Sequence, residues 1–246
     1  MSLEVGKPNR LTIRLGFWSA LLAAATFVIF TICFVAMFLN PPLFVWTNFA
    51  DYVASARNNQ SIFKSLAQLM MLLFAPLYVI LINSIHELAP AGRRVLTRLG
   101  LTFGSLFTAL IGSFYFVQLS TVRLSVVKGQ WGGLEQIVQA NPYGALPALN
   151  MLGWTLFFGL SSLFLAPAVS GGRLANAVRW LFVINGVMCL LGGVGYALEF
   201  TTLVFFTINL GMGGAVTLLT IALCFWFKRM EKQVTHEHSI PSLPEN

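Results

Sequence analysis

Charge is the scarcest property of this chain, because only 9% of its 246 residues are Asp, Glu, Lys or Arg. Six long stretches contain none of these residues. They lie between Arg14 and Asp51, Lys64 and Glu87, Arg98 and Arg123, Glu135 and Arg173, Arg179 and Glu199, and Glu199 and Lys228. A water-soluble domain distributes charge over its whole surface, so this pattern argues against one.

Each uncharged stretch can cross a bilayer as a helix, since about 20 apolar residues span a hydrocarbon core of roughly 30 Å. We predict an all-α polytopic membrane bundle with six transmembrane helices, forming one domain over residues 1–230. The predicted spans are 16–39, 66–85, 99–121, 147–168, 178–197 and 202–227. The polar residues 231–246 lack an apolar anchor and are expected to form a disordered cytoplasmic tail.

Signatures of catalysis and metal binding are also missing. His86 and Glu87 are adjacent, whereas a zinc-binding helix needs ligands at i and i+4, and His236 and His238 fall in the polar tail. The three cysteines have no CxxC spacing, and no span interior contains a histidine or lysine that would hold a haem or a retinal Schiff base. We therefore expect no cofactor and no metal, and an enzyme is the less favoured interpretation.

Lysine and arginine are divided unequally between the two sides of the predicted membrane domain. One side has eleven, namely Lys7, Arg10, Arg14, Arg93, Arg94, Arg98, Arg173, Arg179, Lys228, Arg229 and Lys232, and the other has four, namely Arg57, Lys64, Arg123 and Lys128. Because cations are retained in the cytoplasm during insertion, both termini are expected there, in an inner (plasma) membrane. The net charge of +7 is then explained by orientation and by contact with anionic membrane lipids, without a nucleic-acid partner.

Two long loops are predicted on the outer side, each with an amphipathic segment. In the first, the aromatic residues between 44 and 53 have the spacing of an amphipathic helix, which we expect to lie flat on the outer surface. The second covers residues 128–148 and contains the amphipathic stretch Leu134 to Val138 before a turn at Asn141-Pro-Tyr-Gly144. This second loop either dips into the bundle or caps it.

Small residues mark the expected helix contacts, because close backbone approach drives helix association in lipid. The third span has Gly100, Gly104, Thr108 and Gly112 at intervals of four, and the first has Ala20 and Ala24. We interpret these positions as close crossings within the chain, in preference to a dimer interface.

Polar and aromatic side chains in the outer half of the spans are the candidate site, since such groups usually face the protein interior. They are Gln68, Tyr115, Gln118, Asn150, Trp154, Tyr196, Glu199 and Asn209. Helical spacing places Tyr115 and Gln118 on the face of Gly104, and Asn150 one turn from Trp154. We expect one outward-opening cavity with the two long loops as its lid. Alternatively, these are ordinary interfacial residues, with Glu199 in water at a turn or paired with Arg123.

Two resemblances bear on the class of protein. The elements Tyr115-Phe-Val-Gln118, Val122-Arg123, Asn141-Pro-Tyr-Gly144, Leu152-Gly-Trp154, Leu165-Ala-Pro167 and Arg179-Trp180 resemble those of bacterial six-helix integral membrane proteins of the domain-of-unknown-function type. This resemblance covers about the second half of the chain and implies a fold class without an activity. Separately, Ala20-Leu-Leu-Ala-Ala24 is similar to the Ala-x-x-x-Ala element with which substrate-binding components of energy-coupling-factor vitamin transporters dock their partner.

Three functional hypotheses follow. The first is a noncatalytic membrane protein that binds a lipid or a small apolar molecule in the outer cavity. The second is a transporter component that needs a membrane-protein partner, as the resemblance to vitamin transporters implies. The third is a structural or assembly subunit whose polar groups only pack.

Overall fold

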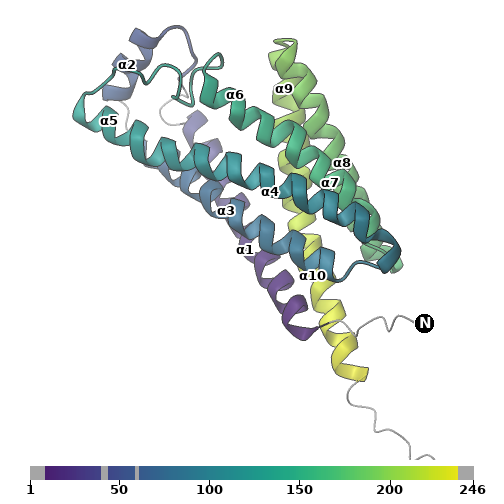
Figure 1. The fold of residues 1–246 in the computed structure, drawn as a ribbon. Coiled ribbons are helices and arrows are strands. Elements are labelled where there is room, and N and C mark those ends of the chain that lie inside the picture. Colours follow the sequence, from purple (N-terminus) through teal and green to yellow (C-terminus); the bar gives the residue numbers. More distant parts are fainter. Residues whose placement is uncertain (1–8, 40–43, 59–60, 238–246) are drawn as a thin grey trace, which may run out of the picture.

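The computed structural model describes residues 9–39, 44–58 and 61–237, and every regular element in these ranges is helical (Figure 1). The α-helices are α1 (Arg10–Leu39), α2 (Phe49–Asn58), α3 (Ile62–Glu87), α4 (Arg94–Val117), α5 (Arg123–Lys128), α6 (Ala145–Leu152), α7 (Phe158–Leu165), α8 (Gly172–Ala197), α9 (Thr201–Val204) and α10 (Gly213–Glu237). Three π-helical segments, η2 (Gln118–Val122), η3 (Gly153–Phe157) and η5 (Phe205–Met212), join α4 to α5, α6 to α7 and α9 to α10. Short 3₁₀ turns, η1 (Ala91–Arg93) and η4 (Ala166–Ala168), complete the set.

Six continuous helical stretches are long and apolar enough to cross a membrane, as the uncharged runs predict. They cover Arg10–Leu39, Ile62–Glu87, Ala91–Lys128, Ala145–Ala168, Gly172–Ala197 and Thr201–Val234. Several begin four to eight residues before the predicted spans, because a helix continues through the interfacial residues that flank its apolar part, where charged side chains reach water.

The last helix also runs beyond the predicted boundary at residue 230, since α10 ends at Glu237. Residues 231–237 were expected to be disordered, and in the structure they are helical. Val234 is buried against the core, and Glu231 lies 3.6 Å from Arg14 of α1 in an ion pair, so this turn is held against the bundle. The rest of the predicted tail lies outside the described residues.

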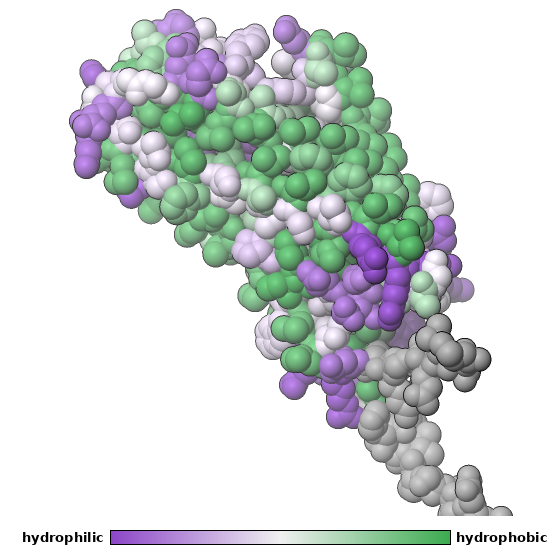
Figure 2. Space-filling view, viewed as in Figure 1, coloured by the Kyte–Doolittle hydropathy of each residue, from purple (hydrophilic) through white to green (hydrophobic). Residues whose placement is uncertain are grey.

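The six long stretches form a closed ring in chain order. α1 packs on α3, α3 on α4, α4 on α7, α7 on α8, and α8 on α10, which returns to α1 (Figure 1). Large side chains with almost no exposure fill the centre of the ring, including Phe74, Phe107, Phe158, Phe182 and Phe227. The outside is apolar as well, and Figure 2 shows a broad hydrophobic band between two hydrophilic ends. This distribution is the one expected of a bundle surrounded by lipid.

Close crossings occur where most of the small residues predict them. A Cβ added at Gly104 would lie 2.9 Å from Ser161 Oγ and would also collide with Ile82, and Thr108 donates a hydrogen bond to the Ala75 carbonyl of α3. Gly112 differs, because no atom lies within 4 Å of an added Cβ there. An interval of four residues rotates the face of an α-helix by about 40° per step, so this series drifts away from the crossing.

The cations of the two groups that the structure describes lie at opposite ends of the bundle. Arg93, Arg173 and Arg229 belong to the end where η1, the start of α8 and the end of α10 meet, whereas Arg57 and Lys128 belong to the end formed by α2, α5, α6 and α9 (Figure 1). The helix order therefore agrees with an alternating path through a membrane. The candidate site lies at the second of these ends.

Candidate ligand cavity

A cavity of about 1040 Å³ opens between the helices at the end of the bundle that has few cations. Its walls come from α1, α2, α3, α4 with η2, α5, the loop before α6, α6 with η3, and η5 with α10. Trp154 forms part of its floor, packed edge-on against Phe107 at 4.9 Å and stacked on Phe74 at 6.2 Å between ring centroids. The volume lies at the upper end of the range for pockets that hold small-molecule ligands.

All three π-helical segments meet this cavity. Gln118 and Val122 of η2, Trp154 of η3, and Ile208, Asn209 and Met212 of η5 all line it. A π-helical turn inserts one extra residue and re-aims the side chains after it, and such turns frequently occur at functional sites. Three of them on separate membrane-spanning stretches, all facing one space, indicate a binding site.

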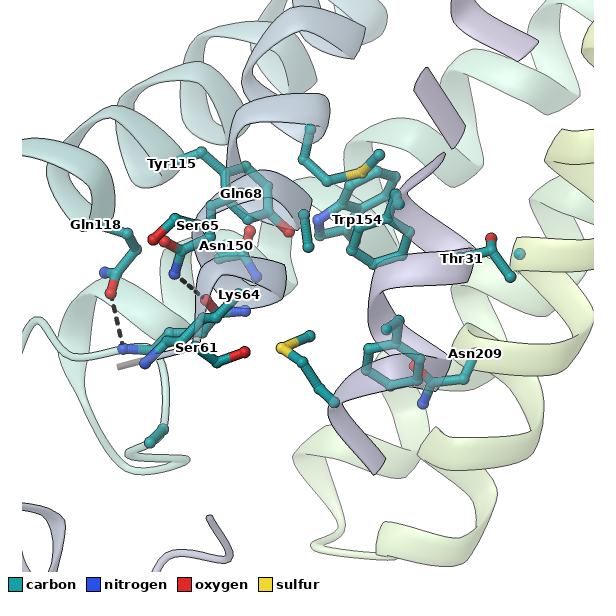
Figure 3. Close-up of a pocket in the computed structure, with 18 of the residues that line it drawn as sticks. Thr31, Ser61, Lys64, Ser65, Gln68, Tyr115, Gln118, Asn150, Trp154 and Asn209 are labelled. Atoms are coloured by element: carbon teal, nitrogen blue, oxygen red, sulfur yellow. Dashed lines mark hydrogen bonds between the residues drawn. The ribbon is translucent and has the colours of Figure 1, made fainter. Parts of the chain in front are cut away.

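Six of the eight predicted site residues line the cavity, namely Gln68, Tyr115, Gln118, Asn150, Trp154 and Asn209. In Figure 3, Gln68, Tyr115, Gln118 and Asn150 lie on one side of the space, and Thr31 and Asn209 lie across it. The result is a convergence of these six side chains on one space. It occurs because the long helices carry the polar groups at one common depth.

The other two predicted residues lie elsewhere. Tyr196 donates a hydrogen bond of 2.8 Å to the Pro142 carbonyl and so anchors the second loop from outside the cavity. Glu199 is exposed at the turn between α8 and α9, in a left-handed conformation with φ of 55°, which agrees with the alternative of a turn residue in water. Arg123 makes its side-chain hydrogen bond with the Leu119 carbonyl, and among the described residues no ion pair joins it to Glu199.

The second loop caps the cavity and does not enter the bundle as a helix. Its stretch Leu134 to Val138 is a series of turns, with both of these side chains buried against Tyr52 and Val122. Gln118 holds the loop at two points, donating to the Ile137 carbonyl at 2.6 Å and accepting from the Gln139 amide at 3.1 Å. Gln139 in turn accepts a bond of 2.7 Å from Gln68.

The first loop reaches the same cap. Its predicted amphipathic segment forms α2, which packs on α5 with Phe44 and Trp46 against Tyr52. Burial raises the pKa of the Tyr52 phenol, so this group stays neutral at physiological pH. Both outer loops thus contribute to the lining, as predicted for a lid.

Replacing Gln118 with Leu is expected to free the second loop without unfolding the bundle. The substitution leaves the Ile137 carbonyl and the Gln139 amide without their partners, and each buried unpaired group costs about 1–3 kcal/mol. Hydrogen exchange of residues 134–141 should then become faster by at least tenfold. Ser120→Ala is the matched control, because this exposed hydroxyl bonds only to Phe116 of its own helix. Unchanged exchange in Gln118→Leu would show that Gln118 does not secure the cap.

Several residues that form the cavity were not among the predicted site residues. Lys64 lies on the lining, although the count of cations places it in an outer loop, and Thr31, Phe30 and Phe34 of α1 form the opposite wall. The sequence could have indicated that Lys64 lines the cavity, because Lys64 and Gln68 are four residues apart and therefore share one face of a helix. The stripe of phenylalanines on α1 had no such signal, because the same stripe would suit a lipid-facing surface equally well.

Two polar atoms at the cavity are buried without a hydrogen-bond partner among the described residues, namely Asn150 Oδ1 and Ser61 Oγ. Buried polar atoms are nearly always paired in native proteins, and an unpaired one points to a water or a ligand as its partner. Both atoms belong to residues of the lining, so a bound molecule would supply the partners that the chain does not.

Metal-ligating side chains do not cluster at this cavity or elsewhere in the described residues. No three of their His, Cys, Asp and Glu side chains are close enough to hold a metal ion together. His86 lies far along α3 from the cavity and bonds to Thr97 Oγ1 at 2.6 Å. The arrangement is therefore suited to binding an amphiphilic molecule, with amides and a cation on one wall and aromatic rings on the other. No family model, curated protein or solved structure matches this chain.

Proposed function

We propose that this protein is a noncatalytic membrane protein that binds a lipid or another small amphiphilic molecule in the cavity between its helices. The observation that carries the proposal is the meeting of three π-helical segments at one cavity that holds unpaired polar atoms. Packing alone does not need such a space, because helices that only scaffold a complex gain stability by filling it.

The proposed orientation places the cavity in the outer half of an inner (plasma) membrane, with both termini in the cytoplasm. The cation-rich end of the bundle supports this orientation, since lysine and arginine are retained on the cytoplasmic side. In that frame, the ligand reaches the cavity from the outer leaflet or from the outer face.

The alternative of a transporter component has less support from the packing. Ala20 and Ala24 are 0% and 7% exposed, and they are covered by this chain's own helices. The Ala-x-x-x-Ala element is thus not free to dock a partner in the way that the resemblance to vitamin transporters implies. Copurification of an ATPase subunit with the intact protein would favour that alternative.

Replacing Asn150 with Leu tests the proposal. Native mass spectrometry of the protein in mild detergent should show a stoichiometric amphiphile on the wild type and an occupancy lowered about fivefold or more in Asn150→Leu, since one hydrogen bond contributes about 1 kcal/mol. The bundle should remain folded, because Asn150 Oδ1 has no hydrogen-bond partner among the described residues, so its loss leaves none of them unpaired.

Asn83→Leu serves as the matched control, because Asn83 is exposed on α3 outside the cavity and bonds only to the Val79 carbonyl. This variant should keep the wild-type adduct. A wild-type protein without any adduct, or an adduct equally occupied in Asn150→Leu, would count against binding in this cavity. The identity of the extracted molecule would then also decide between a lipid and a smaller apolar ligand.

A further inference from the structure

Lys64 lies on the inner face of the first turns of α3. Ser61, Lys64, Gln68 and Met71 all line the cavity, with the spacing of a single helix face (Figure 3). Gln68 is anchored to the loop by a hydrogen bond, whereas Lys64 Nζ makes none with the described residues and lies over the Tyr52 ring, 5.8 Å from its centroid. A cation at a helix end could simply extend to the interface, but this side chain is half-buried and contributes to the wall of a cavity.

No carboxylate of the described residues pairs with this ammonium group. The one ion pair found among those residues joins Arg14 to Glu231 at the opposite end of the bundle. A cation within a membrane domain is costly unless it is paired, so an unpaired one indicates a partner outside the chain. A ring contact offsets only a small part of that cost.

The surroundings of Lys64 also favour negative charge. α3 begins directly before it, and Ser61 at the helix N-cap gives no side-chain hydrogen bond to the first turn among the described residues. The free N–H groups of that turn carry the positive end of the helix dipole. Ser61 Oγ, at the lining and without a hydrogen-bond partner among the described residues, can donate to an anionic oxygen, whereas Asn150 Oδ1 can only accept.

The opposite wall is suited to a hydrocarbon chain. Phe27, Phe30 and Phe34 follow one another along α1 at ring distances of 5.7 and 5.9 Å, and all three line the cavity. Leu210 and Leu218 extend the apolar lining to the surface of η5 and α10, where they are 55% and 58% exposed. A charged end and an apolar channel that reaches the lipid thus lie within one space.

We infer that the ligand is an amphiphile with an anionic head group, a carboxylate or a phosphate, and that Lys64 binds this head group. The chain of the ligand lies along the α1 phenylalanines toward η5 and α10. This inference rests on the proposed function and adds the chemistry of the ligand to it. Charge-assisted hydrogen bonds from lysine to either kind of anionic oxygen are short and strong, so both head groups are recognised by the same contact.

The test compares probes that differ only in their heads. Delipidated protein in neutral detergent is titrated with oleic acid or oleyl alcohol, and separately with phosphatidylglycerol or phosphatidylcholine of matched chains, and occupancy is measured by native mass spectrometry. Wild type should bind the acid roughly tenfold more tightly than the alcohol, as a hydrogen bond to a charged group implies. Lys64→Met, which removes the charge and keeps an unbranched side chain of similar length, should bind both equally, and Lys64→Arg should keep the preference.

Lys128→Met is the matched control, because Lys128 is an exposed cation at the same end and does not line the cavity. It should behave as wild type. A preference for the acid identifies a free fatty acid as the source of the head group, and a preference for phosphatidylglycerol identifies a phospholipid, and each supports the inference. If Lys64→Met keeps the wild-type preference, the inference on Lys64 is wrong although the cavity still binds amphiphiles. If wild type binds none of the probes, the proposed function itself fails.

Discussion

Gly104→Leu is expected to destabilise the bundle by about 3 kcal/mol, at the upper end of the cost of overpacking a core. The glycine lies where α4 crosses α3 and α7, with room for no further atom. An isobutyl group there must displace Ile82 and Ser161. Ser161 makes two buried hydrogen bonds, with Tyr78 at 2.8 Å and with the Gly100 carbonyl at 2.7 Å, so its displacement also breaks a polar link between three helices.

The measurement is the melting midpoint in detergent, which should fall by about 6–12 °C for a chain of this size. Gly112→Leu provides the control on the same helix. An added side chain at Gly112 meets no atom within 4 Å, and leucine favours helix more than glycine does, so its midpoint should stay unchanged or rise. Equal midpoints for Gly104→Leu and wild type would mean that this crossing does not limit the stability of the bundle.

The same two glycines show how far a sequence pattern leads. Both belong to one regular series, yet only Gly104 lies in a close crossing. An interval of four matches the period of an α-helix only approximately, and the series spans three steps of about 40° each. The number and approximate position of the helices long and apolar enough to cross a membrane were predictable, although not their ends, because a run of about 20 residues without charge can cross the hydrocarbon core and is unsuited to a surface in water.

Part of the candidate site was also predictable, from the cost of placing polar groups in lipid. Polar groups are costly in lipid, so Gln68, Gln118 and Asn150 had to face the interior, and at a common depth they meet. The π-helical segments leave no trace in composition or hydropathy, and they decide which neighbours turn into the cavity. Lys64 was missed because counting cations by loop ignores which face of a helix each one occupies.

Tyr196 and Glu199 show the opposite error. They end the fifth span, and the depth argument alone placed them with the others. The chain reverses there within three residues, from α8 to α9, with Glu199 in a left-handed conformation, and neither side chain lines the cavity. The depth of a residue along its helix can thus be predicted from the sequence. Whether its side chain faces the cavity depends on how the helices pack in the folded chain.

Gly214→Trp is expected to weaken binding of the amphiphile by about tenfold to a hundredfold, because the indole occupies part of the cavity that the ligand would otherwise fill. Gly214 lies on the cavity lining in α10, is exposed, and has no atom within 4 Å of an added Cβ. The variant should therefore fold and melt as wild type does. Native mass spectrometry with oleic acid and oleyl alcohol measures the loss.

Gly112→Trp adds the same bulk to an equally open position that does not line the cavity, so its binding should be unchanged. Gly214→Trp should lower the affinity for the acid and the alcohol by the same factor, since it acts on the apolar chain, whereas Lys64→Met should affect the acid alone. Undiminished binding in Gly214→Trp would place the chain of the ligand at the other exposed border of the cavity, near Ile62 and Val127. The two variants thus separate recognition of the head group from accommodation of the chain, which a single cavity mutation cannot do.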